Sequence, residues 1–177
     1  MKNFKWPVAV LVFILTLGIS VGAVLVRQRQ MVNEPLLKRI NELENVRTVE
    51  LRQEDDLQVV VVQLNHVADL SLAYQELQKV ITTMLKQDNY RLELVDERDS
   101  SLTEAMSAVR LALYEGEQRG NFTEINDYVA STLADLNVAD HRIAIDKENI
   151  YFQMRNGDSY LYEIIAREQR GREGERV

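Results

Sequence analysis

Residues 57–64 have the sequence LQVVVVQL, with four adjacent valines, Val59–Val62, at the centre. Successive side chains of a β-strand point to opposite faces of a sheet, so this run places apolar side chains on both faces. Such a strand is typical of the interior of a sheet that is covered on both sides. The sequence therefore predicts a central strand here, whose faces are covered by this chain or by a second protomer.

The segments around this strand predict a hairpin between two helices, followed by another strand. Asn33 and Pro35 are typical of the start of a helix, and Asp69 is placed to cap the helix after the hairpin. Apolar residues recur every three or four positions in both helices. The predicted elements are a helix over 36–44, strands over 46–52 and 57–64 with a charged turn over 53–56, a helix over 70–86 and a strand over 90–95.

The second half of the chain predicts two helices and then strands. Ser101 to Glu104 has the pattern of a capping box, and the helix that it starts should stop near Gly120. Asn121 begins a similar pattern for the next helix. The predicted elements are helices over 101–120 and 121–136, a strand around 143–145, a turn over 146–149, a strand over 150–155 and a final strand after 157.

Asn156-Gly157 is the strongest short hairpin signal in the chain, because these residue types tolerate the positive φ angles of a two-residue turn. With this turn, Arg155 lies opposite Asp158 and Gln153 lies opposite Tyr160. Strand alternation then gives the hairpin two different faces. The face expected to pack on helices carries Ile150, Phe152, Met154 and Leu161. The other face carries Tyr151, Tyr160 and Tyr162.

These three tyrosines have two interpretations, and the sequence leaves both open. Tyrosine combines a large apolar area with a polar tip, so an exposed face of this kind would suit protein interaction. The same face could instead lie under a helix. Tyr151, Tyr160 and Tyr162 are therefore candidates for an interaction surface.

A second kind of segment lies near the N-terminus, where Val8 to Val26 contains 19 consecutive residues without a charge. As a helix it would measure roughly 28 Å, which matches the hydrocarbon core of a bilayer. We expect an uncleaved signal-anchor, within which Gly18 and Gly22 form a G-x-x-x-G face that could pair two helices. The alternative is a secretory signal cleaved after Ala23. Lys2 and Lys5 favour a cytoplasmic N-terminus with the C-terminal domain outside.

The fold class predicted for the whole chain is α+β. One N-terminal transmembrane helix precedes a compact domain of about four helices and six strands in the order αββαβ-ααβββ. The expected organisation is a basic lead and signal-anchor over 1–29, a linker over 30–33, a domain over 34–166 with a sub-boundary at 96–100, and a disordered charged tail over 167–177.

Composition excludes several classes of function. The net charge is −7, and the first 29 residues contain four basic and no acidic residues, so the remainder carries −11. An acidic body argues against nucleic acid as a partner. The chain has no cysteine, which excludes disulfides, thiol catalysis and cysteine-ligated metals.

The sequence contains none of the common catalytic or nucleotide-binding motifs, so we expect no enzyme activity and no cofactor. A metal or hydrolase site would need His66 and His141, or the acidic clusters 54–56 and 96–99, to converge in the fold. Both clusters lie in predicted turns, where solvated carboxylates are common for structural reasons.

The sequence thus predicts a single-pass membrane protein that presents an α+β domain for protein interaction. Its architecture resembles that of the small anchored modules of bacterial envelope assemblies, without any shared motif. The expected partners are the lipid bilayer and either another protein or a second copy of the chain. The alternative is an extracytoplasmic domain that senses or binds a small ligand, and a hydrolase is the third hypothesis.

Overall fold

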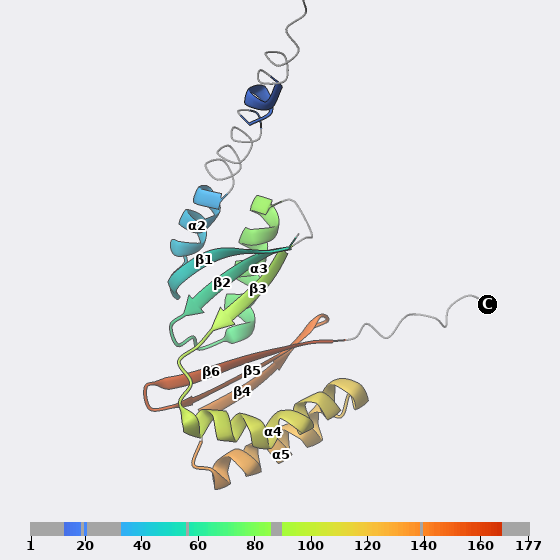
Figure 1. Cartoon of the computed structure of the whole chain (residues 1–177). Coiled ribbons are helices and arrows are strands. Elements are labelled where there is room, and N and C mark those ends of the chain that lie inside the picture. The colour runs from blue at the N-terminus through green and yellow to red at the C-terminus, as the bar shows by residue number, and fades with distance from the viewer. Residues whose placement is uncertain are drawn as a thin grey trace, which may run out of the picture.

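A computed structural model describes residues 13–18, 20, 33–55, 57–85, 90–138 and 140–167 of the 177. Within these residues the fold is α+β, and the elements after residue 33 follow the predicted order αββαβ-ααβββ (Figure 1). They are α2 (Glu34–Asn41), β1 (Val46–Glu54), β2 (Leu57–Leu64), α3 (Leu70–Leu85), β3 (Tyr90–Val95), α4 (Ser100–Arg119), α5 (Phe122–Asp135), β4 (Asp140–Ile145), β5 (Asn149–Asn156) and β6 (Ser159–Ala166).

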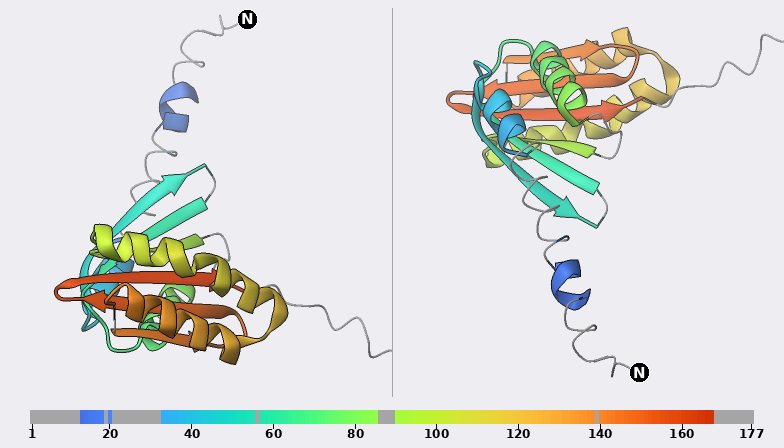
Figure 2. Two further views of the ribbon diagram at one scale, coloured as in Figure 1. Left: turned by 90° about the horizontal axis from the view of Figure 1, so that it is seen from below. Right: turned by 90° about the horizontal axis from the view of Figure 1, so that it is seen from above.

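The strands form two separate sheets of three strands, in which β2 and β5 are the middle strands. In the first sheet β2 is antiparallel to β1 and parallel to β3, and in the second β5 is antiparallel to both β4 and β6. The parallel pair is made possible by α3, which supplies the crossover from β2 to β3. Figure 2 shows the β1-β2 hairpin projecting away from the second sheet in both views.

The valine-rich strand β2 is the central strand of its sheet, as the sequence predicts, and all four valines are buried. Val60 and Val62 belong to a core cluster with residues of α2 and α3. Val59 and Val61 point to the opposite face, where the register places charged residues of β1 and β3 beside them. The side chains of these charged residues therefore flank Val59 and Val61 on the outer face. Among them, Arg91 is ion-paired with Glu54 and Glu93.

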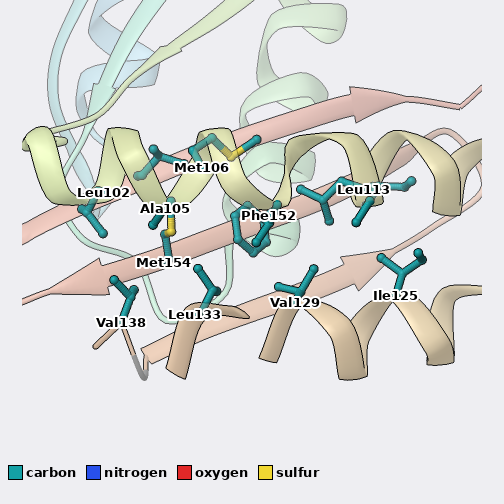
Figure 3. Packing of buried hydrophobic residues seen from close by; sticks show 14 of the residues in the cluster. Leu102, Ala105, Met106, Leu113, Ile125, Val129, Leu133, Val138, Phe152 and Met154 are labelled. Carbon is teal, nitrogen blue, oxygen red and sulfur yellow. The ribbon is translucent and has the colours of Figure 1, made fainter. Parts of the chain in front are cut away.

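The second sheet is buried on both faces, because α4 and α5 cover one side and α3 reaches the other. Phe152 and Met154 of β5 pack with α4 and α5 in the larger apolar cluster (Figure 3). Tyr151 on the same strand instead joins the cluster of α2, α3 and the first sheet. The alternation predicted for this strand is thus confirmed, and both of its faces are core.

The register of the last hairpin differs from the prediction. Asn156 pairs with Ser159, so the turn is Gly157-Asp158, and Arg155 lies opposite Tyr160. Gly157 has φ +61°, whereas Asp158 has no positive φ, which is the pattern of a type II′ turn with glycine first. The shift moves each pairing by two residues, so every side chain keeps its predicted face.

The helix caps are predicted only in part. Asp69 caps α3, since its Oδ1 accepts the N–H groups of Ser71 and Leu72 at 3.0 and 3.2 Å. The cap of α4 is Asp99 rather than Ser101, with the Leu102 N–H donating to Asp99 Oδ1 at 2.8 Å.

Two predicted asparagine caps make no capping hydrogen bond. Asn33 is in helical conformation at the start of α2, and its Oδ1 accepts from Gln58 Nε2 at 3.3 Å. Asn121 instead donates through Nδ2 to Glu124 Oε2 at 2.9 Å. Asn33 thus bonds a side chain of β2, and Asn121 bonds a side chain of its own helix, in place of the N–H groups at the two helix starts.

The predicted membrane span lies largely outside the described residues. Residues 13–18 and 20 are helical, and none of the helices in the described part of the chain is long and apolar enough to cross a bilayer. Gly18 has open space around it, and Gly22 is outside the described residues. The linker over 30–32, the cleavage site after Ala23 and the tail over 168–177 are outside them as well.

Candidate functional site at the junction of the two sheets

The segment between β2 and α3 is held by two tyrosines of the second sheet. The Tyr160 hydroxyl donates to the Leu64 carbonyl at 2.6 Å, and the Tyr162 hydroxyl donates to the Asn65 carbonyl at 2.9 Å. The Tyr162 hydroxyl also accepts the Val67 N–H at 2.7 Å. The buried backbone of this connection thus obtains its hydrogen bonds from another sheet.

Gln153 of β5 completes this arrangement. Its side-chain oxygen accepts the Leu70 N–H at 2.7 Å, and its side-chain nitrogen donates to the Val67 carbonyl at 3.0 Å. Gln153 is 9% exposed, so both ends of its amide are matched inside the protein. The two sheets are therefore joined by buried polar contacts as well as by apolar packing.

An ion pair joins the start of α3 to the edge strand β4. Arg142 donates to Asp69 Oδ2 at 2.6 Å. Burial alone would raise the pKa of Asp69, but the hydrogen bonds from Ser71 and Leu72 and the positive charge of Arg142 outweigh it, so the pKa lies below its ordinary value. The ionised carboxylate thus caps the helix and contacts the other sheet at once.

A second carboxylate contact lies further along α3. The Tyr151 hydroxyl and Gln75 Nε2 both donate to Asp146 Oδ2, at 2.8 and 3.0 Å. Burial, and then the hydrogen bond to Asp146, raise the pKa of Tyr151 to about 12. Burial would raise the pKa of Asp146, but these hydrogen bonds and those from two backbone N–H groups lower it. Burial likewise raises the pKa of Tyr162.

Next to the junction, β3 and β6 meet and then separate. Tyr160 pairs with Glu97 in an antiparallel bridge, and its N–H donates to the Glu97 carbonyl at 3.1 Å. At Tyr162 the contact is made by side chains, because Asp96 Oδ2 accepts the Tyr162 N–H at 2.8 Å and Arg98 donates to its carbonyl at 3.3 Å. Figure 1 shows the two strands diverging beyond this point.

The space between the diverging strands is a groove of about 600 Å³, which we call the β3–β6 groove. Leu92 and Leu94 of β3, Ile164 of β6 and Tyr74 of α3 are partly buried residues of the inner core that also line it. Its remaining lining is Arg91, Glu93, Arg98, Asn149, Tyr162, Glu163 and Ala166. The groove therefore combines apolar core side chains with charged groups of both signs.

The structure brings the three candidate tyrosines together, but inside the chain. Tyr151, Tyr160 and Tyr162 are 1%, 2% and 5% exposed. They contact α3 and the connection before it, so an exposed aromatic surface is not what this face forms. The sequence left exposure and burial open. The hydroxyls of Tyr160 and Tyr162 reach backbone groups beyond their own sheet, whereas the Tyr151 hydroxyl donates to the Asp146 side chain. Of the three, Tyr162 lines the groove.

The histidines and acidic clusters are dispersed. His66 lies edge-on to Tyr160 with ring centroids 6.0 Å apart, and burial lowers its pKa. His141 is on β4, and its Nδ1 is buried without a hydrogen-bond partner. Asp96 contacts Arg98, and Glu97 contacts Arg47. Within the described ranges, no three histidine, aspartate or glutamate side chains are grouped to hold a metal ion.

Sequence patterning did not identify Gln153 or Asp96 as junction residues. A single glutamine in an alternating strand has the same pattern whether it faces solvent or a buried loop, and Asp96 lies in a polar connector. A usable signal was the local context of Gln153, whose immediate neighbours in the strand, Phe152 and Met154, are large and apolar. Neither the family models nor the curated proteins with which the chain was compared provide a match.

Proposed function

We propose that this chain is a single-pass membrane protein whose α+β domain binds other proteins as a structural component of a bacterial envelope assembly. The uncharged segment Val8–Val26 supports the anchor, and the basic residues Lys2 and Lys5 support a cytoplasmic N-terminus. The domain would then lie outside the cytoplasm, where a chain without cysteine is not exposed to oxidation of thiols.

The observation that carries the interaction function is the pair of strand edges that borders the β3–β6 groove. Among the described residues, β3 pairs with β2 alone, and β6 pairs with β5 and, through Tyr160, with Glu97. Strand edges with free N–H and C=O groups are templates for pairing with another chain. The buried contacts of Gln153 and Tyr162 hold the two sheets together, which keeps these edges in a fixed arrangement.

The alternative of a small-ligand sensor also has an observation in its favour. A groove of about 600 Å³ lined by Tyr74, Tyr162 and polar side chains has the size of a ligand site. However, Arg98 is already bonded to Asp96, and Asn149 donates to the Tyr151 hydroxyl at 3.2 Å. Because these polar groups already have partners, we favour a protein partner.

Two measurements on cells test the proposal. Protease added to intact spheroplasts should digest the C-terminal domain and spare a cytoplasmic marker protein, and protection of the domain would overturn the outside placement. Crosslinking in the same cells should then join the domain to one or more proteins. Recovery of the chain without any crosslinked protein, together with a bound small molecule, would favour the sensor.

A further inference from the structure

The backbone of β6 presents unsatisfied groups to the β3–β6 groove. Tyr160 and Tyr162 both direct their N–H toward the segment that directly follows β3, where the Glu97 carbonyl and the Asp96 carboxylate accept them. The N–H and C=O groups of alternate residues in an antiparallel strand point to the same edge, so those of Ile164 and Ala166 also face the groove. Within the described residues no hydrogen bond reaches Ile164 or Ala166 from that side.

The side chains of Asp96 and Arg98 take the place of a neighbouring strand at Tyr162. The carboxylate accepts the Tyr162 N–H and the guanidinium donates to its C=O, which are the two bonds that a paired strand would make. The edge pairing that begins at Glu97 is thus continued by side chains for one residue and then stops. A further strand in the groove would continue a ladder that already exists.

The groove also indicates which side chains such a strand should carry. On the inner side Tyr74, Leu92 and Ile164 offer apolar contacts. On the outer side Glu163 is 21% exposed at its side chain, and its nearest cation, Arg110, is 4.0 Å away. A basic residue opposite Glu163 would improve this pairing, because opposite charges across two strands are stabilising. The net charge of −11 on the chain after residue 29 also favours a basic partner, because opposite charges attract the two proteins to each other.

From these observations we propose that the β3–β6 groove binds an extended, net-basic segment of a partner protein, which adds to β6 as an antiparallel strand with alternating apolar and basic side chains. This inference rests on the interaction function proposed above and names its mode. Antiparallel pairing is the more stable arrangement, and β6 with eight residues is longer than β3 with six. Main-chain bonds would give affinity, and the alternating side chains specificity.

A peptide test uses the full chain in detergent micelles. The probe is a fluorescent, end-blocked peptide of alternating valine and lysine, equal in length to the eight residues of β6. We expect saturable binding by anisotropy. Loss of about tenfold or more in affinity is expected when the lysines are replaced by glutamate, or when alternate backbone nitrogens are methylated. Equal binding of the methylated peptide would overturn strand addition.

Two matched proline variants locate the site on the protein. Ala166→Pro removes an N–H that faces the groove while leaving the β5–β6 ladder intact, and should reduce peptide affinity about tenfold or more. Ile145→Pro makes the same change on the free edge of β4, because Ile145 is in the same pairing phase there, and should leave affinity unchanged. Equal loss in both variants, or in neither, would overturn the assignment of the groove.

Two further outcomes separate this inference from the general function. A protein crosslinked in cells whose yield is unchanged by Ala166→Pro would overturn strand addition at β6 and leave the interaction function in place. Peptide binding that appears only after deletion of residues 168–177 would assign the groove to the tail of the chain itself. We expect instead that the deletion leaves affinity unchanged.

Discussion

Among single residues, Gln153 has a consequential side chain, because its one amide bonds both an N–H and a C=O of the connection between the sheets. Replacing it by alanine leaves the Leu70 N–H and the Val67 C=O buried without partners. We expect Gln153→Ala to lower the free energy of unfolding by about 1–3 kcal/mol. Urea denaturation of the full chain would measure this.

The matched control for Gln153 is Gln118→Ala, on the exposed side of α4, where the side chain donates to its neighbour Glu117. Its effect should stay within about 0.5 kcal/mol. Equal stability losses in the two variants would show that the buried amide contributes nothing special to the junction.

Junction residues such as Gln153 and Asp96 are where prediction from sequence reaches its limit. Each acts through a partner that is distant in the chain, 83 residues for Gln153 and Leu70 and 66 for Asp96 and Tyr162. Local patterning determines which face a side chain occupies but not which backbone segment it meets there. Alternation along the strands places the three tyrosines on one face, so the sequence identified them as a group. Alternation does not show what covers that face, so their role stayed open.

At the scale of elements, local signals predicted the order αββαβ-ααβββ because each helix and strand has its own periodicity. What they missed was the competition between nearby signals of the same kind. Asp99 and Ser101 are both good caps, and Asp99 is the one used. Asn156-Gly157 and Gly157-Asp158 are both plausible turns, and pairing along the whole hairpin selects the second.

The cap choice predicts a difference between two neighbouring substitutions. Asp99→Ala removes the acceptor of the Leu102 N–H and should cost about 1 kcal/mol of stability, within the usual range of 0.5–2 for a lost cap. Ser101→Ala removes no capping bond and should change stability by less than about 0.5 kcal/mol. Thermal denaturation followed by circular dichroism would compare them. The opposite ranking would restore the cap expected from the sequence.

The turn makes a similar prediction. Gly157 has φ +61° with open space around its Cα, so Gly157→Ala should be destabilising by conformation alone, by about 1–2 kcal/mol. Asn156 lies at the end of a strand with no positive φ, so Asn156→Ala should have little effect. Chemical denaturation of both variants would separate the two registers. A type I′ turn at 156–157 would instead make both substitutions costly.

At the scale of the whole molecule, the junction joins two core clusters that meet at β5. Phe152 belongs to the cluster under α4 and α5, and Tyr151 belongs to the cluster around α3. The polar contacts near this junction use ionised carboxylates and a neutral phenol, because Asp69 pairs with Arg142, and Asp146 accepts from Gln75 of α3 and from the Tyr151 hydroxyl. Stability should therefore fall at both extremes of pH, for separate reasons.

On the acid side, the pKa values of Asp69 and Asp146 are lower in the folded chain than their ordinary value of 3.8. Their stabilisation is present above pH 3.8 and should be lost as the pH falls through the lower folded values. Asp69→Asn and Asp146→Asn should each reduce this acid dependence, measured as the free energy of unfolding against pH. An unchanged slope in both variants would contradict the assignment.

On the alkaline side the dependence of stability on pH has the opposite sign. The pKa of Tyr151 is raised from 10.0 to about 12, so above pH 10 the unfolded chain loses its phenolic proton while the folded chain keeps it. Stability should fall between about pH 10 and 12, and Tyr151→Phe should remove part of that fall. Tyr114→Phe is the matched substitution for comparison, since the Tyr114 side chain is 48% exposed. A slope that Tyr151→Phe leaves intact would mean that burial and the contact with Asp146 do not hold the proton on this hydroxyl.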